Sequence, residues 1–336
     1  MTSADSPSAP RADGTLRIID ADQTRARLPF ANLIAALREA FVAGCEVPAR
    51  HHHTIERRGL PSATLLLMPA WTATGFLGVK VVSVFPGNAA RHEPALHSTY
   101  LLSDGTTGRP LAMIDGNELT GRRTVAASAL AASFLAREDA SSLLIVGAGR
   151  VASLVAAAYR EVRPIERVTV WNTNLLRAEK LAARLRGDGF DAVAATRLDQ
   201  AAAQADIITC ATLSTQPLIE GRWLRPGTHL DLIGGFTPTM RETDDEAVRR
   251  SAVYVDTMAA VEEAGDLVMP IAAGHFAASA VRGTLEMLCR GATNGRASRD
   301  QITMFKSVGT ALEDLAAAAL VYSGRNDAGY IAGASR

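Results

Sequence analysis

Residues 141–159 read SSLLIVGAGRVASLVAAAY, and this stretch decides the fold. Residues 143–146 form a short, wholly apolar run of the kind that makes a parallel strand buried on both faces. The glycine turn Gly147-Ala148-Gly149 follows at once, and an alanine-rich segment with high helix propensity comes next. Strand, glycine turn and helix in this order are typical of a dinucleotide-binding unit. The alternative is a structural strand-to-helix turn that binds nothing.

Three small residues of this turn have predicted tasks. Gly147 allows the tight turn, Gly149 lets a pyrophosphate approach the backbone, and Ala152 lets the helix pack close to the strand. The helix N-terminus adds free N–H groups and the positive end of the helix dipole. The pattern therefore predicts an α/β fold with a Rossmann-type doubly wound parallel sheet.

Length, charge and cysteine content exclude several classes of protein. The 336 residues predict two domains, and a formal net charge of +0 argues against a nucleic-acid partner. No apolar run has membrane-spanning length, and residues 1–14, polar and without a signal-peptide core, are expected to form a disordered arm. Cys45, Cys210 and Cys289 fit neither a disulfide framework nor a metal site, so a reducing cytoplasm is expected.

The first third of the chain is predicted to be rich in strands. One helix begins at Pro29 and ends at Gly44, and strands are expected at residues 15–19, 64–68, 77–85, 97–102 and 110–114. We expect Pro69 to close the second strand, and a hairpin turn over residues 104–108 to join the last two. The adjacent His51, His52 and His53 do not suggest a metal site, because neighbours in an extended chain point to opposite faces.

Lys80 is the one charged residue in the apolar run 77–85. Its side chain faces either solvent or a ligand cavity in which an anion would offset the cost of its desolvation. The pattern alone leaves both alternatives open.

The second half of the chain alternates strands with helices. Residues 118–137 are predicted to form a long helix, and strands are expected at 168–171, 206–210, 227–235 and 253–256. The acidic residues at 242–246 are expected to mark a helix start. Residues 299–322 are predicted to form one long alanine-rich helix.

The residues after the strand at 168–171 bear on the choice of cofactor. An NAD-binding unit commonly has a carboxylate there, about 20 residues after the glycines, for the ribose hydroxyls. In this chain Asn172 and Thr173 follow Trp171, and Arg150 and Arg177 are close in sequence. Basic and hydroxyl groups without an acid suit a 2′-phosphate. We therefore expect NADP(H) in preference to NAD(H), which stays possible.

Further motifs are spread over nearly the whole chain, from about Arg50 to about Tyr322. They are Val47-Pro48-Ala49-Arg50, Leu67-Met68-Pro69, Gly78-Val79-Lys80, Phe85-Pro86-Gly87-Asn88, Asp115-Gly116, Leu119-Thr120-Gly121-Arg122-Arg123-Thr124, Gly147-Ala148-Gly149, Glu263-Ala264-Gly265-Asp266, Phe305-Lys306-Ser307-Val308-Gly309 and Glu313-Asp314. At this density and in this order, the chain resembles the ornithine cyclodeaminase/mu-crystallin family.

The resemblance implies a particular domain arrangement. A substrate and dimerisation domain would be built from residues 15–121 and from a C-terminal helix within residues 301–336. A Rossmann domain, residues 122–300, would be inserted between these two parts. Two subunits would join through the strand-rich domains as a homodimer, and the active site would lie in the cleft between the domains.

The resemblance also implies roles for residues. By motif position, Arg50, Lys80 and Arg123 match residues that hold and polarise an amino-acid-like substrate, with Lys80 and Arg123 as the catalytic pair. Val308 is expected to bind the substrate as well. No metal is expected. The residues expected to bind the cofactor are Gly147, Gly149, Arg150, Val151, Asn172, Thr173, Arg177, Ile233 and Ser307.

One departure from the family pattern points to a branch of it. Members that deaminate ornithine carry an aspartate after the Gly-Gly of the fourth Rossmann strand, whereas here Phe236 follows Gly234-Gly235. A second acid expected just before the Met-Pro motif is replaced by leucines at residues 65–67. Phe236 cannot take a proton, so the chain looks more like the branch that reduces cyclic ketimines such as Δ1-pyrroline-2-carboxylate or its six-membered homologue.

The expected chemistry is hydride transfer to the C2 carbon of a cyclic imine. Arg50 would bind the substrate carboxylate bidentately, and Lys80 and Arg123 would add positive potential. Lys80, with its pKa lowered by burial among cations, is a candidate to manage the imine proton.

Three other functions stay open. The first is a cyclodeaminase in which Asp231 or Glu242 replaces the missing aspartate. The second is an amino-acid dehydrogenase. The third is a protein that keeps the dinucleotide but has lost turnover, as mu-crystallin illustrates.

Overall fold

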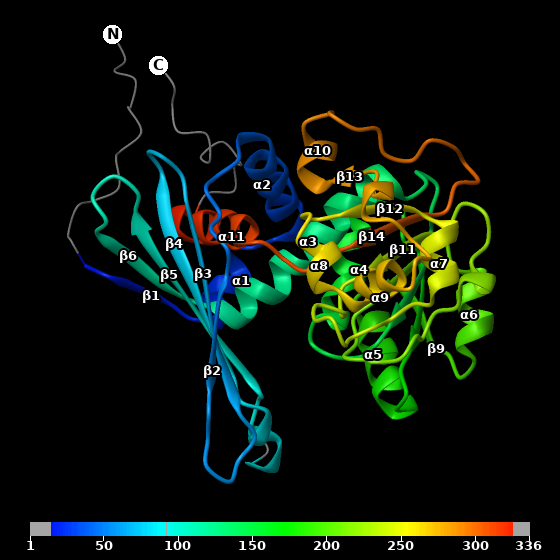
Figure 1. The fold of residues 1–336 in the computed structure, drawn as a ribbon, viewed down its shortest axis with the longest axis horizontal. Coiled ribbons are helices and arrows are strands. Elements are labelled where there is room, and N and C mark those ends of the chain that lie inside the picture. Colours follow the sequence, from blue (N-terminus) through cyan, green and yellow to red (C-terminus); the bar gives the residue numbers. More distant parts are fainter. Residues whose placement is uncertain (1–14, 92, 325–336) are drawn as a thin grey trace.

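The protein is described by a computed structural model over residues 15–91 and 93–324. The expected arm at residues 1–14 lies outside the described residues. The chain folds around two sheets, and the long helix α3 (Gly116–Leu135) runs between them and packs against strands of both (Figure 1). The predicted combination of a parallel sheet with a strand-rich α+β unit is confirmed.

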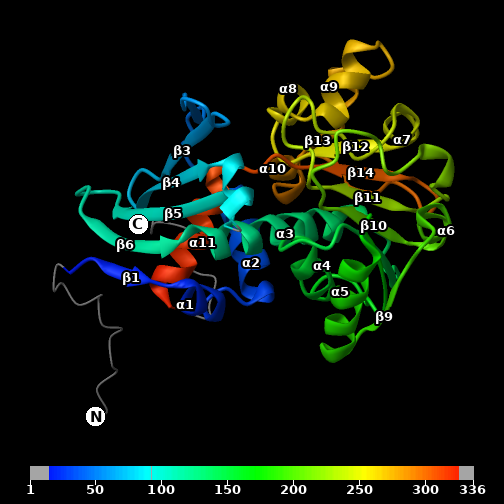
Figure 2. The same cartoon turned by 90° about the horizontal axis from the view of Figure 1, so that it is seen from below.

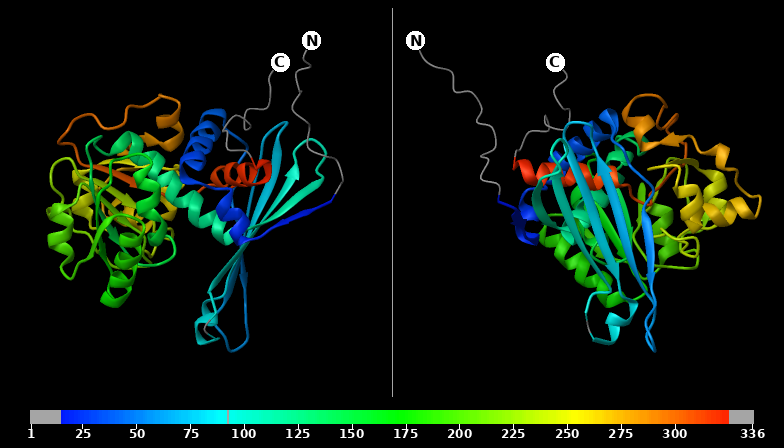
Figure 3. Two further views of the ribbon diagram at one scale, coloured as in Figure 1. Left: turned by 180° about the vertical axis from the view of Figure 1, so that it is seen from behind. Right: turned by 60° about the vertical axis from the view of Figure 1, so that its left-hand side comes forward.

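The first sheet has six strands in the order β1-β6-β5-β4-β3-β2, and all neighbours except β1 and β6 run antiparallel. Its strands are β1 (Arg17–Ile19), β2 (His51–Ile55), β3 (Ala63–Trp71), β4 (Phe76–Val84), β5 (Leu96–Asp104) and β6 (Pro110–Asp115). Helix α11 (Ala311–Ser323) covers one face, and no helix of the described chain covers the opposite face (Figure 3).

Pro69 does not close its strand as expected, because β3 continues to Trp71. The ladder between β2 and β3 stops at the pair His51–Leu67, so Pro69 of β3 has no partner in β2. A residue without an N–H costs no ladder bond at such an edge, which explains why proline is tolerated there.

The second sheet has eight parallel strands in the order β13-β12-β14-β11-β10-β7-β8-β9. Its strands are β7 (Ser142–Val146), β8 (Arg167–Trp171), β9 (Asp191–Ala194), β10 (Ile207–Cys210), β11 (His229–Leu232), β12 (Ala252–Val255), β13 (Gly283–Thr284) and β14 (Thr303–Lys306). The strand order reverses at β7, the strand that carries the glycine turn. Such a reversal places ligands at the carboxyl ends of the strands.

Helices cover both faces of the parallel sheet, with α4 and α5 on one side and α7, α8 and α9 on the other (Figure 2). The remaining helical elements of the described chain are α1 (Ala21–Ala26), α2 (Phe30–Ala43), α4 (Ala152–Arg160), α5 (Leu175–Gly187), α6 (Leu198–Gln204), α7 (Asp245–Arg250), α8 (Ala260–Glu263), α9 (Gly265–Ala272), α10 (Leu285–Cys289) and the 3-10 turns η1 (Pro86–Arg91), η2 (Gly221–Trp223) and η3 (Ala278–Ala280). Over residues 15–91 and 93–324, no helix is both long and apolar enough to cross a membrane.

The predicted single helix over residues 299–322 is wrong. Residues Thr303–Lys306 form β14, which is buried between β11 and β12, and only Ala311–Ser323 is helical. Gly309, with a φ of +79°, has a backbone conformation that no helix contains, and Thr310 caps the start of α11. The place of β14 in the parallel sheet also differs from the expected domain boundary at residue 301, because this strand belongs with the Rossmann elements.

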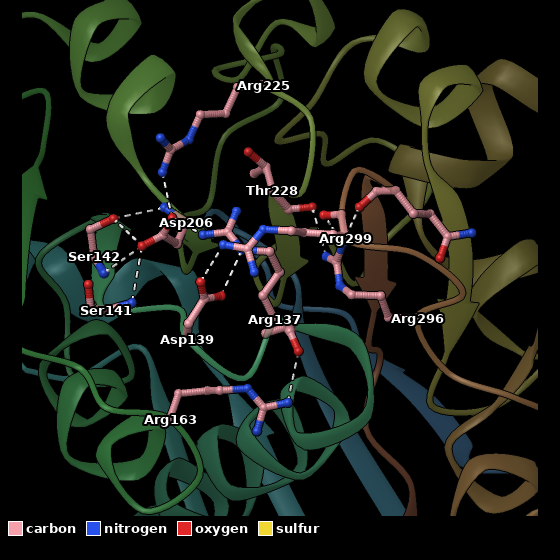
Figure 4. Close-up of polar contacts among 12 residues, drawn as sticks. Arg137, Asp139, Ser141, Ser142, Arg163, Asp206, Arg225, Thr228, Arg296 and Arg299 are labelled. Carbon is pink, nitrogen blue, oxygen red and sulfur yellow. Dashed lines mark hydrogen bonds and ion pairs between the residues drawn. The ribbon is translucent and has the colours of Figure 1, made fainter.

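The amino-terminal edge of the parallel sheet is tied together by Asp206 (Figure 4). Its buried carboxylate accepts hydrogen bonds from the N–H groups of Ser141 and Ser142, at 3.1 and 3.0 Å, and from Arg137 and Arg225, at 2.6 and 2.5 Å. Burial opposes ionisation, but the hydroxyl of Ser142, which donates at 2.7 Å, together with the two N–H groups and Arg137, outweighs it and lowers the pKa of Asp206 to about 2. This edge lies opposite the carboxyl ends of the strands, so its contribution is to stability.

We expect Asp206→Ala to lower the free energy of unfolding by about 3 kcal/mol, because two arginines and two N–H groups lose their shared acceptor. A carboxylate with a depressed pKa stabilises the fold above its unfolded-state pKa, and the effect is lost as pH falls through the folded value. Urea denaturation should therefore show a constant difference from wild type between about pH 5 and 7, and a shrinking one below about pH 4. Asp139→Ala removes a half-exposed carboxylate of the same cluster and should cost clearly less. An equal loss in the two variants would contradict this account.

Candidate active site

The glycine turn has the space and the conformation that a dinucleotide needs. Gly147 has a φ of +114°, and a Cβ there would lie 2.6 Å from the carbonyl oxygen of Ala211, so only glycine fits. A Cβ on Gly149 would meet nothing within 4 Å, so the backbone there borders open space. α4 begins at Ala152 without a side-chain cap, and Arg150 is exposed beside it. The turn therefore offers an accessible backbone and an uncapped helix start to a pyrophosphate.

No carboxylate stands at the end of β8. Asn172 donates its side-chain N–H to the carbonyl of Asn174, Thr173 is exposed, and Asn174 caps α5 by accepting from the N–H of Arg177. These groups lie at the carboxyl edge of the sheet next to the glycine turn, because the N–H of Gly147 donates to the carbonyl of Trp171.

The segment after β14 lies at the same edge of the sheet. Ser307 is buried and donates its N–H to the carbonyl of Leu232, the last residue of the adjacent strand β11. Ile233 comes directly after that strand. Asp256, at the end of β12, accepts from the N–H groups of Val308 and Gly309 at 2.8 and 2.6 Å. These bonds hold the 307–309 segment against the sheet.

A second buried carboxylate, Glu242, joins two loops at this edge. One oxygen accepts from the N–H and hydroxyl of Thr212, each at 2.7 Å, and the other accepts from the N–H groups of Gly234 and Gly235 at 2.7 and 3.3 Å. Glu242 therefore holds the backbone of two loops together. It is not part of the helix start, which Asp244 to Glu246 form. The expectation that it belongs to the acidic helix start is wrong for this residue.

Gly234 and Gly235 have no room for a side chain. A Cβ on Gly234 would collide with the backbone of Thr212, and one on Gly235 would lie 2.4 Å from the carboxylate of Asp266. Phe236 is the first residue after these two glycines, and 47% of its surface is exposed. The position after the two glycines is thus taken by an exposed aromatic ring, which cannot accept a proton.

Four side chains, Lys80, Arg123, Glu313 and Asp314, form what we call the buried ion cluster. Asp314 of α11 contacts Lys80 Nζ of β4 at 2.7 Å and Arg123 Nε of α3 at 2.8 Å. Glu313 Oε2 contacts Arg123 Nη1 at 2.5 Å. Lys80 faces inwards, with 3% of its side chain exposed, so the solvent-facing alternative is wrong. Carboxylates pair with both Lys80 and Arg123, so the positive potential that the sequence predicts from these two residues is offset within the cluster.

Arg50 reaches the cluster from the other side of the 307–309 segment. Its Nη2 donates to the carbonyl of Gly309 at 2.7 Å and lies 3.6 Å from Glu263 of α8. A Cβ on Gly309 would lie 2.6 Å from Arg123 Nη1, so no side chain fits at this position. The Gly309 backbone therefore contacts the guanidinium groups of both Arg50 and Arg123. The structure thus brings Arg50 and Arg123 together at Gly309, two residues after Ser307, and joins Lys80 to Arg123 through Asp314.

Burial and pairing move the pKa values of the cluster apart. Burial raises the pKa of Glu313 to about 7, and Arg123 only partly offsets this. Burial acts on Asp314 in the same sense, but Arg123 and Lys80 outweigh it and lower the pKa of Asp314. Burial lowers the pKa of Lys80 to about 8, with Asp314 opposing the shift and Arg123 adding to it. Carboxylates with separated pKa values are suited to different roles.

Asp231 lies outside the site. Its carboxylate is buried between the parallel sheet and helices α3 and α4, where it accepts from Ser128 at 3.0 Å and from Tyr159 at 2.8 Å. It does not face the cluster.

Sequence reasoning missed several functional carboxylates. Glu313 and Asp314 occurred in a motif but were given no task, and Asp256 was read only as the end of a strand. The available signal was two adjacent acids inside a strongly apolar helix, because ionised acids are rarely fully buried unless they are paired.

Comparison with known proteins shows the family to which the chain belongs. A sequence profile of the ornithine cyclodeaminase/mu-crystallin family matches residues 21–328. A Δ1-pyrroline-2-carboxylate reductase of Paracoccus denitrificans is 43% identical over 265 residues, which cover 78% of this chain and 84% of that protein.

Two solved structures share the fold over nearly the full length. The Δ1-pyrroline-2-carboxylate reductase of Thermococcus litoralis in complex with NADH and L-proline has a TM-score of 0.86 and 31% identity, covering 92% of this chain and 97% of that one. An archaeal alanine dehydrogenase dimer with bound NAD has a TM-score of 0.85 and 27% identity, covering 92% of this chain and 95% of that one.

We expect Gly149→Ala and Gly147→Ala to fail in different ways. The first adds a methyl group in open space, so the melting temperature should stay unchanged while dinucleotide affinity falls about tenfold or more, or about 1.4 kcal/mol. The second should also destabilise the fold by about 1–3 kcal/mol, because a non-glycine residue is strained there. Titration of bound NADPH or NADH by fluorescence, beside thermal denaturation, checks both.

Gly187→Ala is the matched control, since it also adds a methyl group in open space but at the end of α5. It should bind the dinucleotide as wild type does. Unchanged affinity in Gly149→Ala would remove this turn from the binding site.

Proposed function

We infer that this chain, which belongs to the ornithine cyclodeaminase/mu-crystallin family, is a nicotinamide-dependent reductase of cyclic ketimine carboxylates. Its proposed reaction converts Δ1-pyrroline-2-carboxylate to L-proline, and the six-membered homologue to L-pipecolate. The observation that carries this inference is the meeting of Arg50, Lys80 and Arg123 at the cofactor edge of the sheet. The relatives that are named for this reaction add support.

Arg50 is the residue that we assign to the substrate carboxylate. The exposed fraction of its side chain is 21%, against 3% for Lys80 and 7% for Arg123. A guanidinium group also matches a carboxylate with two parallel hydrogen bonds. Arg50 is therefore the cation of the three that an entering anion reaches first.

Lys80 is the residue that we assign to the imine proton. Reduction adds a hydride to C2 and a proton to nitrogen, so that the C=N bond becomes CH–NH; the reduced nicotinamide, when bound, supplies the hydride. With a pKa of about 8, Lys80 holds its proton at neutral pH and can still release it. Asp314, at 2.7 Å, fixes the direction of the ammonium group.

A cyclodeaminase reaction would need Glu242 or Asp231 to replace the missing aspartate, and neither is free to do so. Glu242 uses both oxygens for backbone and hydroxyl donors, and Asp231 is buried between the sheet and two helices. Phe236 occupies the position after the two glycines. This arrangement favours reduction over ammonia loss.

We propose NADP(H) as the preferred cofactor. Support comes from the residues after β8, which have no acid to repel a 2′-phosphate and include the amide of Asn172, the hydroxyl of Thr173 and the exposed Arg177. The solved relatives hold NADH or NAD, so NAD(H) remains the alternative. We also propose a cytoplasmic location, supported by the three free thiols.

The deciding assay measures oxidation of NADPH, and separately of NADH, with Δ1-pyrroline-2-carboxylate, beside ammonia release from L-ornithine. We expect rapid oxidation of the reduced cofactor, with kcat/KM higher for NADPH, and no ammonia. Ammonia from ornithine would replace this proposal by cyclodeamination. Cofactor oxidation that needs ammonia and pyruvate would replace it by amino-acid dehydrogenase activity.

We also propose a homodimer that joins through the uncovered face of the six-stranded sheet. Ile18, Met113, Leu101 and Val79 are aligned across β1, β6, β5 and β4, and the first three are 78%, 41% and 37% exposed. An apolar row across four strands is unusual on a free surface. A second copy of this chain is the partner that the resemblance implies.

Replacing Leu101 and Met113 together by lysine should convert the dimer to a monomer, because two charges would be buried in the interface. Sedimentation velocity checks the mass of the particle. Val193→Lys, on the exposed strand β9 of the other sheet, is the control and should leave the mass unchanged. A wild-type monomer, or a double variant with unchanged mass, would overturn the proposal.

A further inference from the structure

The charge balance around the buried ion cluster is not positive. Lys80 and Arg123 supply two positive charges, while Glu313, Asp314 and Asp256 supply three negative ones when all are ionised. The charge of Lys306 also acts on Asp256, but Asp266 pairs with Lys306 at 3.4 Å and offsets it. Asp256 is linked to the cluster through Gly309. Its carboxylate accepts a hydrogen bond from the N–H of Gly309, and the Cα of Gly309 packs against the Arg123 guanidinium. All five side chains are buried.

An anionic substrate would add a further negative charge to this buried group. Uncompensated charge in a low-dielectric site is costly, and a titratable neighbour then changes its protonation state instead. Arg50 offsets part of the added charge, but it already lies 3.6 Å from Glu263. Entry of the anion therefore favours protonation of one of the three carboxylates.

The geometry distinguishes the three carboxylates. Asp314 uses one oxygen for Arg123 and the other for Lys80. Asp256 accepts from three backbone N–H groups, two on one oxygen and one on the other. Glu313 uses only Oε2, and its Oε1 is buried without a hydrogen-bond partner. A proton on Glu313 therefore breaks no hydrogen bond.

We propose that binding of an anionic substrate is coupled to the uptake of a proton by Glu313. This inference rests on the proposed function, which supplies a carboxylate-bearing substrate. The charged groups that face Glu313 are Arg123 from α3, Lys80 from β4, Asp256 after β12 and Asp314 on its own helix. Glu313 is a positioning residue here: once neutral, it competes less for Arg123 Nη1, which becomes available to the entering carboxylate.

The coupling has a definite sign. The protonated form of Glu313 is the form that accepts the anion, so affinity should be greatest below the pKa of Glu313, about 7, and should weaken as pH rises through it. The opposite dependence would follow if an ionised Glu313 were needed for binding.

Calorimetry counts the proton directly. Pyrrole-2-carboxylate, a flat ring carboxylate without a C=N bond to reduce, is titrated into the cofactor-saturated enzyme at pH 7.0 in buffers of different ionisation enthalpy. We expect uptake of about half a proton, because a group with a pKa near 7 is half protonated before the anion enters. In Glu313→Gln the uptake should fall to about one tenth of a proton, because Lys80, with a pKa of about 8, is still largely protonated before the anion enters.

Glu118→Gln is the matched control. Glu118 also lies within salt-bridge distance of an arginine of α3, Arg122 at 3.7 Å, but it is outside the cluster. Its replacement should leave the uptake at the wild-type value. The thermal unfolding of each variant shows whether the fold is kept.

The outcomes separate this inference from the proposed function. Zero uptake by the wild type, no binding of the ring carboxylate, or undiminished uptake in Glu313→Gln overturns the inference, whether or not the imine is reduced. Uptake that depends on Glu313 in an enzyme that does not reduce the imine overturns the proposed function and leaves the proton coupling in place.

Discussion

Asp314 is the residue on which the site depends, because its single carboxylate joins three separate parts of the chain. It lies on α11 and contacts Lys80 of β4 and Arg123 of α3, all nearly excluded from water. A buried ion pair contributes little net stability by itself, but removing one partner leaves a costly unpaired charge. The arrangement of sheet, interdomain helix and final helix is therefore linked to the position of two cations. The same contact orients the ammonium group to which we assign the imine proton.

Other acids at the carboxyl edge of the parallel sheet accept hydrogen bonds from the backbone and hold loops in place. Glu242 joins the loops after β10 and β11, Asp256 holds the 307–309 segment, and Asp266 accepts from the N–H groups of Glu242 and Thr243 while lying 3.4 Å from Lys306. Loops at this edge carry the cofactor in a Rossmann-type sheet. Buried carboxylates that accept several N–H groups make such loops rigid. Rigid loops keep the distance between cofactor and substrate short, which hydride transfer requires.

The sequence was sufficient to predict the Rossmann-type sheet, the glycine turn and the pairing of a strand-rich unit with it. Local patterns carry that information, because a buried parallel strand and an amphipathic helix each have a period of their own. The break at Gly309 was not predictable in the same way, because the alanine-rich segment favours one continuous helix and only the strands β11 and β12 select β14. The role of Glu313 and Asp314 was missed for a related reason. Their partners, Lys80 and Arg123, lie about two hundred residues earlier in the chain, and spacing along a helix says nothing about them.

The way in which this site uses its carboxylates limits the chemistry open to it. Ammonia loss from a diamino acid needs a carboxylate that is free to receive a proton from the substrate amine. In the described chain Asp256 and Glu242 are held by backbone donors, Asp314 is held by two cations, and Phe236 takes the exposed position after the glycines. Glu313 has one oxygen, Oε1, with neither a hydrogen bond nor an ion pair, and this oxygen is buried, while Oε2 contacts Arg123. Such a group can balance the charge of an incoming anion, but it is not placed to deprotonate an amine, which agrees with the proposed hydride transfer and with the proposed assignment of the imine proton to Lys80.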